Sequence, residues 1–546
     1  MTASGEPFAT QQEILKPFAR DPDGVDRRRT RRTILIIVSI FCFLYGFAFA
    51  LFAPMLLLPL ISPIPVLFLV VIWALPESRT APIRSLSTLT FVFVAGLVLW
   101  PNYIAVAPPG LPWITMARIT GFPLVLSLLL CTSISADFRS QVATAVSANP
   151  IVWKLLLAFV VLQTLSIGFS RHPFQSFDKL IVAQVSWTAM FFIAAYVFMT
   201  PGRIEKMAKL LWSMAMVVGV IGVFEWRKAG ILWIGHIPHI LQIPDPAVQY
   251  ALATHVRSGD GTYRTQSTFS TSLGFGEYLA LTFPFILHFL FGKYKPFTKT
   301  VAFLSIPPMM LFIYITGSRL AVVGALMSYI LYYTIWAVLR WRSNRQSLVA
   351  PAMLLALPGG AGILGALILF WPRLHNAVIG SGAAQYSTDA RKAQVALAIP
   401  KAISHPWGYG MGMSADTVGF TNPSGFLTLD SYYLTVLIEY GIIGFIVYFG
   451  LLAASIFYAA RFSSISQRMN SEYSYLIPLA IAMSNFFVIK SVFSQQDNHP
   501  IIFMFLGMIA ALCSRIDSDR RSAELGTHAI STAAPPATPS RRSTRG

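Results

Sequence analysis

Apolar runs long enough to cross a lipid bilayer recur along almost the whole chain, from residue 33 to residue 513. A helix needs about 20 apolar residues to span the hydrocarbon core, where only helices and closed barrels satisfy their backbone hydrogen bonds. The composition agrees, since 55% of the 546 residues are hydrophobic and only 12% are charged, about half the charged share of a soluble protein. The sequence predicts an all-α, polytopic transmembrane helical bundle.

We predict about fourteen crossings, so that both ends of the chain lie on one side of the membrane. The predicted spans are 33–52, 55–75, 86–106, 117–136, 151–169, 182–200, 210–226, 273–291, 300–316, 320–338, 349–371, 432–460, 474–494 and 500–514. Lys and Arg gather in the loops on the side of the N-terminus, which the positive-inside rule makes the cytoplasm. These cations are Arg79, Arg84, Arg139, Arg203, Lys206, Lys209, Lys293, Lys295, Lys299, Arg340, Arg342, Arg345, Arg461 and Arg468.

Two predicted outer loops are much longer than the others, which makes an extracytoplasmic site the first hypothesis. The predicted organisation is a basic cytoplasmic tail (1–32), N-terminal spans (33–226), a first long outer loop (227–272), central spans (273–371), a second long outer loop (372–431), C-terminal spans (432–514) and a disordered cytoplasmic tail (515–546). The first span follows an Arg-rich segment without a clear cleavage site, so we interpret it as an uncleaved anchor.

Charge and cysteine content argue against several classes of protein. The net charge of +19 lies largely in inner loops and tails, which indicates membrane orientation rather than nucleic-acid binding. The cysteines Cys42, Cys131 and Cys513 lie in or beside apolar runs, so no disulfide framework is predicted. His236 and His239 flank a proline without an acidic or Cys partner at zinc spacing. Since there is also no P-loop or nucleotide fingerprint, we predict neither a metal nor a cofactor.

The stretch from His405 to Phe445 begins as a Gly-rich loop and continues as an apolar helix. Glycines alternate with larger residues in HPWGYGMG, which suits a backbone that bends tightly or lies close to a ligand. Asp430 stands where the loop becomes the helix, a favourable N-cap position. Such a loop exists at membrane depth only where it is buried in protein or lines a wet cavity, so it is a candidate site.

Some cations lie on the outer side against the orientation rule, and three of them are candidate site residues: Arg264, Arg319 and Arg391. Arg319 begins the predicted span 320–338, where free backbone N–H groups and the helix dipole favour an anion. Arg391 opens a predicted interfacial helix and faces its apolar side. The apolar stripe predicted for that helix comprises Val395, Ala398, Ile399 and Ala402. Three converging guanidinium groups suit a diphosphate; alternatively, each arginine reaches lipid headgroups at the end of a span.

Two further ionisable residues are candidates for contact with a substrate. Glu277, in the first turn of the predicted span 273–291, either caps that helix or serves a site. His499, just before the last span, either faces the outer cavity or is hydrogen-bonded within the bundle.

The order of these elements resembles the O-antigen ligase and polymerase superfamily over residues 260–510. The matching elements are an Arg in a TFS-containing segment, GSR at the start of a span, an Arg before HPWGYGMG, and DSYYLTVLIEYGIIGF. The resemblance implies an inner-membrane glycosyltransferase of the C-type fold, which transfers sugar chains from undecaprenyl diphosphate at the periplasmic face without a metal or nucleotide. It also implies that Arg264, Arg319 and Arg391 bind the donor diphosphate.

At one position the chain departs from the family pattern. Ligases of the family place a His, their proposed base, just before the helix that Asp430 precedes here. This departure favours a polymerase, for which the acceptor is the next lipid-linked repeat unit, over a ligase that acts on lipid A core or protein. A carboxylate at Asp430 has the chemistry to accept the acceptor's proton, and Arg319 would stabilise the leaving diphosphate.

The sequence therefore predicts a polymerase of O-antigen, capsule or exopolysaccharide. Its expected partners are the lipid-linked oligosaccharide, membrane lipids, and the flippase and chain-length regulator of the same pathway. Two other classes remain: a transporter of the lipid-linked sugar, although the sequence has no inverted repeat of the kind common in transporters, and a membrane scaffold, which would not need the arginines.

Overall fold

The structure is a computed structural model of the 546-residue chain. It describes residues 63–77, 82–107, 113–245, 248–249, 252, 263–343, 345–346, 348–349, 351–352, 354–356, 359, 366, 369–370, 385–422, 425–466 and 471–532. The chain divides into one compact unit of residues 1–81 with 129–136, and a second of residues 82–128 with 137–546. In the first unit the Ser133 hydroxyl donates to the carbonyl of Ile72, in helix α3, at 2.6 Å. All candidate site residues belong to the second unit.

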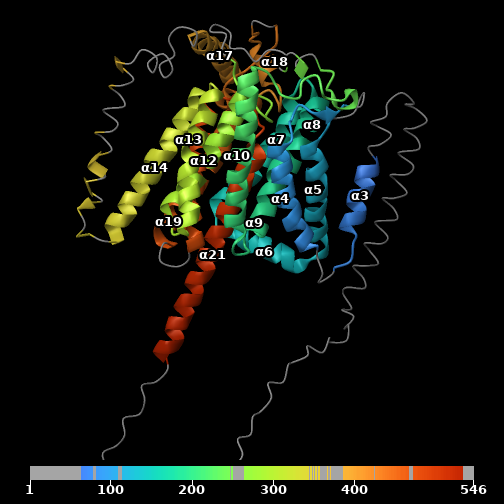
Figure 1. Ribbon diagram of the computed structural model, residues 1–546. Helices are drawn as coiled ribbons and strands as arrows, with labels where there is room; N and C mark the ends of the chain where they lie inside the picture. Colours follow the sequence, from blue (N-terminus) through green and yellow to red (C-terminus); the bar gives the residue numbers. More distant parts are fainter. Residues whose placement is uncertain are drawn as a thin grey trace, which may run out of the picture. The chain divides into compact units, whose positions relative to one another are not determined.

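Helices make up almost all of the described secondary structure (Figure 1). The α-helices are α3 (Pro63–Trp73), α4 (Ile83–Leu99), α5 (Met116–Ile134), α6 (Ala136–Ser147), α7 (Pro150–Ser166), α8 (Pro173–Ala183), α9 (Ala189–Val197), α10 (Arg203–Lys228), α12 (Ser272–Phe291), α13 (Pro296–Ile315), α14 (Arg319–Ser343), α17 (Gln385–Ser404), α18 (Ser414–Val418), α19 (Tyr432–Ser466), α20 (Leu476–Ile489) and α21 (His499–Thr532). The 3₁₀ turns are η1 (Ile167–Phe169), η3 (His239–Leu241) and η5 (Ser471–Tyr475), and η2 (Gln184–Thr188) is a π-helical turn. The strands β1 (Ala105–Val106) and β2 (Ile114–Thr115) pair antiparallel.

Ten helices of the described chain are long and apolar enough to cross a membrane. This confirms the predicted all-α polytopic membrane fold. The first predicted span, 33–52, lies outside the described residues, as do parts of 55–75 and most of 349–371. Several predicted boundaries are wrong. The span predicted to begin at residue 182 begins at Pro173, because η2 joins α8 and α9 into one continuous helix. The span predicted to begin at residue 210 begins at Arg203, and the last span, predicted to end at residue 514, ends at Glu524.

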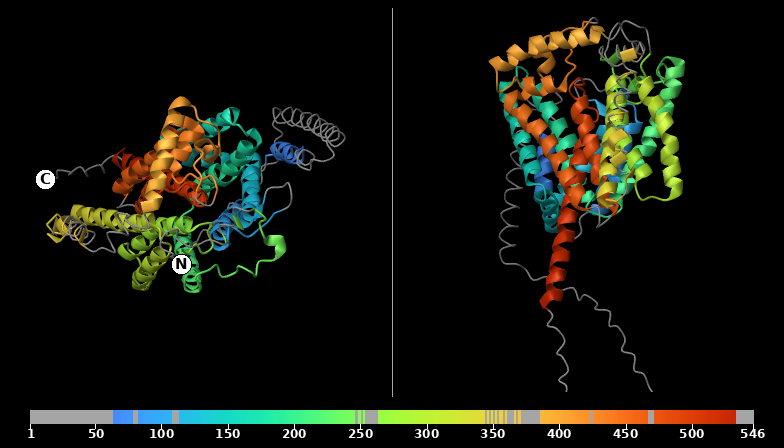
Figure 2. Two further views of the ribbon diagram at one scale, coloured as in Figure 1. Left: turned by 90° about the horizontal axis from the view of Figure 1, so that it is seen from above. Right: turned by 90° about the vertical axis from the view of Figure 1, so that its left-hand side faces the viewer.

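Hydrogen bonds connect the ends of seven helices at one end of the second unit, which we call the α17 end. Helices α12, α14, α19 and α21 begin there, and α10, α13 and α20 end there. Helix α17 lies across these helix ends, with α18 beside it (Figures 1 and 2). The α17 end therefore collects both segments in which the sequence places candidate site residues.

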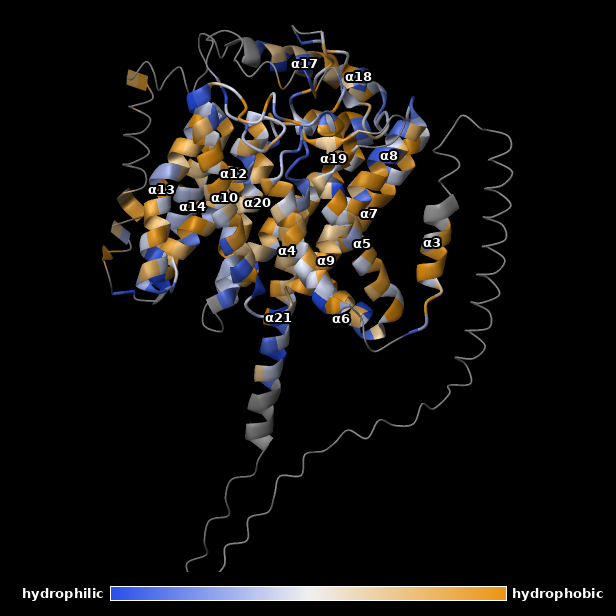
Figure 3. Cartoon of the chain, turned by 45° about the vertical axis from the view of Figure 1, so that its right-hand side comes forward, coloured by the Kyte–Doolittle hydropathy of each residue, from blue (hydrophilic) through white to orange (hydrophobic). Residues whose placement is uncertain are grey.

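Helix α21 corrects the prediction of a disordered tail from residue 515. It continues to Thr532, and residues 533–546 lie outside the described part. Figure 3 shows hydrophilic residues along the stretch of α21 beyond the apolar bundle. The buried side chain of Arg515 is ion-paired with Glu472 at 2.7 Å, which fixes α21 where it leaves the bundle.

Candidate functional site

Two of the predicted arginines lie at the turn between α13 and α14: Arg264 packs against this turn, and Arg319 follows it as the first residue of α14. The backbone N–H of Thr265 donates to Ile315 O at 3.1 Å, and Arg264 Nε donates to Thr316 O at 3.2 Å. Gly317 has φ +61°, and a Cβ atom there would lie 3.1 Å from Arg264 Nε. Glycine therefore lets Arg264 lie against the turn, two residues before Arg319 begins α14.

A carboxylate on α10 holds the segment that carries Arg264. Glu225 is 1% exposed, and its Oε1 atom accepts from Tyr263 OH at 2.7 Å and from Gln266 N at 2.9 Å. Its Oε2 atom accepts from Ser267 N at 2.8 Å. Both carboxylate oxygens are thus engaged by residues 263–267, so Glu225 fixes the backbone on either side of Arg264.

Asp430 lies against α17. Its backbone N–H donates to Gln394 Oε1 at 3.0 Å, and the Gln394 side chain is buried. Burial raises the pKa of the Asp430 carboxyl, whereas the charge of Arg391 and the neighbouring Gln394 amide lower it. Arg391 and Asp430 therefore interact electrostatically, and Arg391 Nε is buried without a hydrogen-bond partner among the described residues.

The structure gives the N-cap of α19 to Ser431 rather than to Asp430. The Ser431 hydroxyl accepts a long hydrogen bond, 3.5 Å, from the backbone N–H of Leu434. A side-chain oxygen that accepts from the third residue of the helix is the usual N-cap arrangement. The Asp430 carboxyl is consequently not needed to cap the helix.

The Gly-rich loop and the apolar helix that follows it in sequence meet at Gly441. This residue has φ +69° and ψ −171° inside α19, a conformation essentially confined to glycine. The break exposes backbone groups to which the loop binds: Tyr409 N donates to Ile438 O at 2.8 Å, and Ile442 N donates to Pro406 O at 3.1 Å. A Cβ at Gly441 would overlap the Pro406 carbonyl. From Gly408 to Met413 the loop is thus packed against protein, one of the two alternatives that the sequence allowed, whereas Trp407 just before it is 61% exposed.

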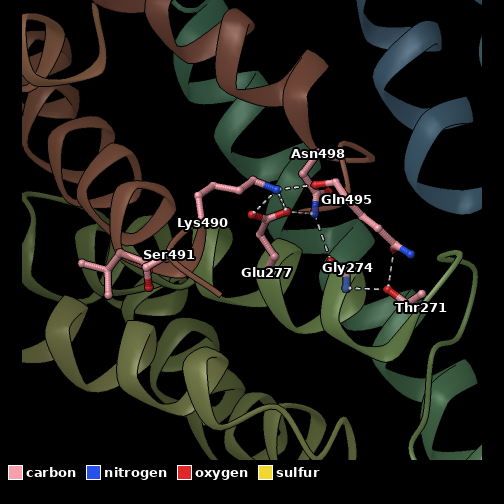
Figure 4. Close-up of polar contacts among 8 residues, drawn as sticks. Thr271, Gly274, Glu277, Lys490, Ser491, Gln495 and Asn498 are labelled. Atoms are coloured by element: carbon pink, nitrogen blue, oxygen red, sulfur yellow. Dashed lines mark hydrogen bonds and ion pairs between the residues drawn. The ribbon is translucent and has the colours of Figure 1, made fainter. Parts of the chain in front are cut away.

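Glu277 is part of a buried polar cluster (Figure 4). Its Oε1 atom lies 3.0 Å from Lys490 Nζ, and its Oε2 atom accepts from Asn498 Nδ2 at 2.9 Å. The side chains of Glu277 and Lys490 are fully buried. Lys490 Nζ also donates to the carbonyl of Gln495. The helix N-cap is Thr271, whose hydroxyl accepts from Gly274 N at 3.2 Å, so Glu277 does not cap α12.

His499 is fully buried among aromatic rings rather than hydrogen-bonded within the bundle. Its ring stacks on Trp187 at a centroid distance of 4.7 Å and meets Tyr432 edge-on at 4.8 Å. Neither ring nitrogen has a hydrogen-bond partner among the described residues. The structure therefore places His499 inside the aromatic packing between η2, α19, α20 and α21.

The predicted site residues form two groups. Arg264 lies against the α13–α14 turn that precedes Arg319, and Arg391 interacts electrostatically with Asp430. Contacts through Glu277 and Lys490 connect the groups, because Gly276 packs against Ser318 and Lys490 O accepts from Tyr432 N at 3.0 Å.

The predicted stripe of α17 is partly wrong. Val395 and Ile399 are 45% and 39% exposed, whereas Gln394 and Ala398 are buried. Ala398 packs with residues of α18 and α19. The buried stripe therefore runs along Arg391, Gln394 and Ala398, at helical spacings of three and four, because Gln394 is needed at the start of α19.

Sequence analysis missed Glu225 and Lys490. Each is an ionisable residue within or at the end of an apolar span, which is a signal of function or of a buried partner. Their partners lie far away in sequence, so the signal alone does not identify the role. The described residues contain no group of three or more His, Cys, Asp or Glu side chains placed to hold a metal ion.

Comparison with protein families places this site in context. Residues 301–449 match the family model described as O-antigen ligase. The match includes Arg319, Arg391 and Asp430, and it leaves Arg264, Glu277 and His499 outside. It confirms the resemblance to the O-antigen ligase and polymerase superfamily, whose members are glycosyltransferase-like enzymes of O-antigen processing. No curated protein matches the chain.

Proposed function

Starting from the O-antigen ligase domain at residues 301–449, we propose that the chain is a glycosyltransferase that polymerises lipid-linked oligosaccharide repeats. The donor would be an oligosaccharide on undecaprenyl diphosphate, and the acceptor the next lipid-linked repeat unit. The α17 end would face the periplasm of a bacterial inner membrane. The observation that carries the proposal is the pairing of Arg264 with the turn that begins α14 at Arg319.

The turn has the chemistry to bind a diphosphate. Guanidinium groups bind phosphate oxygens in a bidentate fashion, and the first backbone N–H groups of a helix point at an anion. In the reaction the acceptor hydroxyl forms a bond to the anomeric carbon of the donor sugar, and the bond from that carbon to the diphosphate breaks. Arg264 and Arg319 would stabilise the charge that develops on the leaving undecaprenyl diphosphate, and Arg391 would extend the site towards the acceptor.

Asp430 would take the proton of the attacking hydroxyl. A general base must be close to the reacting group and unprotonated. Asp430 meets the first requirement if the acceptor lies beside Arg391, and Ser431 releases it from capping α19. Glu277 and His499, which the sequence predicts as substrate contacts, are both buried in the structure.

A ligase that transfers a finished chain to lipid or protein is the second candidate, and the family match favours neither over the other. The carboxylate at Asp430, where ligases would carry His, favours the polymerase. The flippase and the chain-length regulator of the same pathway are the expected partners of either enzyme.

The carrier lipids that accumulate without this protein test the proposal. A strain that lacks the chain should accumulate single repeats on undecaprenyl diphosphate, and wild-type protein should restore the polymer. Long chains left on the carrier would identify a ligase instead. An unchanged set of lipid-linked sugars would contradict both enzyme functions.

Arg319 provides the matched variant. Arg319→Lys keeps the charge but loses the planar fork, so it should restore little polymer at normal protein abundance, measured by immunoblot. Full activity of Arg319→Ala would contradict the binding role and leave only contact with lipid headgroups.

A further inference from the structure

The two groups of candidate residues are joined by a chain of contacts through one buried ion pair. On one side, Gly276 packs against the residue before Arg319, since a Cβ there would lie 3.1 Å from Ser318 Cβ and 2.9 Å from Ala321 Cβ. The next residue along α12 is Glu277, which is paired with Lys490 at 3.0 Å. This close packing ties the Glu277 turn of α12 to the start of α14.

On the other side, Lys490 holds the start of α19. Its carbonyl accepts from Tyr432 N at 3.0 Å, two residues after Asp430. Its ammonium group lies 5.5 Å from the centre of the Tyr432 ring and 4.6 Å from that of Phe493. Lys490 therefore contacts the first residue of α19 through both its backbone and its side chain.

Further hydrogen bonds fix the pair in one arrangement. Asn498 donates to Glu277 Oε2, and also to the carbonyl of Gly274 at 3.0 Å. Gln495 takes part through both its side chain and its backbone (Figure 4). Its side-chain Oε1 accepts from the Thr271 hydroxyl at 2.8 Å, and its backbone carbonyl accepts from Lys490 Nζ. The cluster thus joins the segment that leads from Arg264 into α12 to the loop between α20 and α21.

Stability alone does not account for an ion pair at this position. Removing two charges from water carries a large free-energy cost, and apolar residues of similar volume often stabilise a protein equally or better. A charged pair with additional hydrogen bonds, however, accepts only one relative placement of its helices. The effect expected of such a pair is therefore to fix the relative position of the helices that carry it, rather than to stabilise the fold.

We infer that Glu277 and Lys490 are positioning residues that set the separation between the donor-binding turn at Arg319 and Asp430. The inference rests on the proposed function, because the two groups need a defined separation only if they act on one reaction. Both carboxylate oxygens of Glu277 are engaged within the protein, so Glu277 acts through its neighbours rather than on the substrate.

The double variant Glu277→Gln/Lys490→Met tests this inference. It removes both charges together, so that neither is left unpaired in the interior. In purified full-length protein in lipid nanodiscs, we expect kcat per folded molecule to fall about 10–100-fold, since a shift of about 1 Å costs up to 10²-fold. The KM for the lipid-linked donor should change little, because Arg264 and Arg319 keep their shared turn.

The chain offers a matched control near the middle of α21, where the helix leaves the bundle. The pair Glu472–Arg515 is also buried, with 2.7 Å between the charged atoms. Arg515 lies about 24 Å further along α21 than His499, at 1.5 Å per residue. Glu472→Gln/Arg515→Met should therefore leave kcat per folded molecule at the wild-type value. Equal losses of kcat in the two double variants would overturn the inference, as would wild-type kcat in Glu277→Gln/Lys490→Met.

Hydrogen exchange supplies a readout that does not depend on activity. The peptide that covers residues 428–436 should exchange faster in Glu277→Gln/Lys490→Met than in the wild type or in the control. Unchanged exchange there would overturn the inference whatever the kinetics show. Failure of the wild type to transfer oligosaccharide would overturn the proposed function, and the exchange experiment would still decide whether the pair fixes the start of α19.

Discussion

Two carboxylates near the α17 end, Glu225 and Asp430, have very different surroundings. Glu225 accepts three hydrogen bonds, at 2.7, 2.9 and 2.8 Å, all from the segment that carries Arg264. Asp430 uses its backbone N–H to bind Gln394, and Ser431 caps the helix that follows. The Asp430 carboxyl instead interacts with the charge of Arg391.

The difference separates a structural carboxylate from a candidate base. A carboxylate whose oxygens are engaged by backbone N–H groups cannot accept a proton without breaking the structure that those groups hold. The Asp430 carboxyl interacts only with side chains, the Gln394 amide and the charge of Arg391, and Ser431 caps the helix, so Asp430 can change protonation without breaking backbone hydrogen bonds. The comparison therefore supports the proposal that Asp430 transfers the proton, while Glu225 holds the segment that carries Arg264.

The largest expected effect is that of Asp430→Asn. The amide keeps the shape of the side chain but has no basic oxygen, and loss of a general base typically costs about 10²–10⁴-fold in rate. We expect kcat for transfer between lipid-linked repeats to fall by this factor, with unchanged thermal stability and donor KM. Asp430→His should retain more activity than Asp430→Asn, since imidazole also accepts a proton. Near-normal kcat in Asp430→Asn would show that Asp430 is not the base, so that it would not differ in role from the structural carboxylate Glu225.

Glu225→Gln should produce a smaller effect of a different kind. Both oxygens of Glu225 accept hydrogen bonds, and glutamine has an NH₂ group in place of one of them, so at least one of these hydrogen bonds is lost. Hydrogen bonds to charged groups are worth about 1.5–3 kcal/mol each. The segment at Arg264 should loosen, so that donor KM rises about tenfold, equivalent to 1.4 kcal/mol, while kcat changes less. Steady-state kinetics in nanodiscs measure the two constants separately.

Tyr263→Phe is the matched control for Glu225→Gln. It removes one of the three donors to Glu225 and leaves the two backbone donors in place. Its rise in KM should be smaller than that of Glu225→Gln. A fall in kcat without a rise in KM for Glu225→Gln would show that Glu225 acts in the chemistry after all.

The sequence contains the signals for some of these features and not for others. The apolar runs predict the membrane fold, because each run must be long enough to span the bilayer and must form its backbone hydrogen bonds within its own helix. The close packing of the Gly-rich loop is also predictable from the sequence, because glycines allow two backbone segments to approach each other closely. Such features depend on residues near one another in sequence.

The anchors of the site were not predictable in the same way. Glu225 binds residues about forty positions away, and Lys490 pairs with Glu277 across more than two hundred. No local pattern identifies such partners, since the packing of α10, α12 and α20 brings them together. The end of α21 was missed for a related reason: its charged extension resembles disordered sequence, yet it continues a helix fixed by Arg515.

The pH dependence of transfer sharpens the comparison further. The pKa of Asp430 is raised by burial and lowered by the charge of Arg391. Activity that needs the carboxylate is full above this pKa and is lost as the pH falls through it. Arg391→Gln removes the charge that lowers the pKa, so the acid limb of the kcat profile should move to higher pH. Arg264→Gln should leave the limb in place, because Arg264 lies at the other group. Identical shifts in both variants would contradict the assignment of Arg391 to Asp430.

The smallest expected effect is that of Ser431→Ala. Loss of an N-cap hydroxyl typically costs about 0.5–2 kcal/mol, and the 3.5 Å bond to Leu434 N places this cap at the weak end of that range. We expect a small decrease in thermal stability and a nearly unchanged kcat, the reverse of the pattern for Asp430→Asn. Differential scanning fluorimetry and transfer kinetics on the same preparations measure both. Greater destabilisation by Asp430→Asn than by Ser431→Ala would identify Asp430 as the cap, and its carboxyl would then be as structural as that of Glu225.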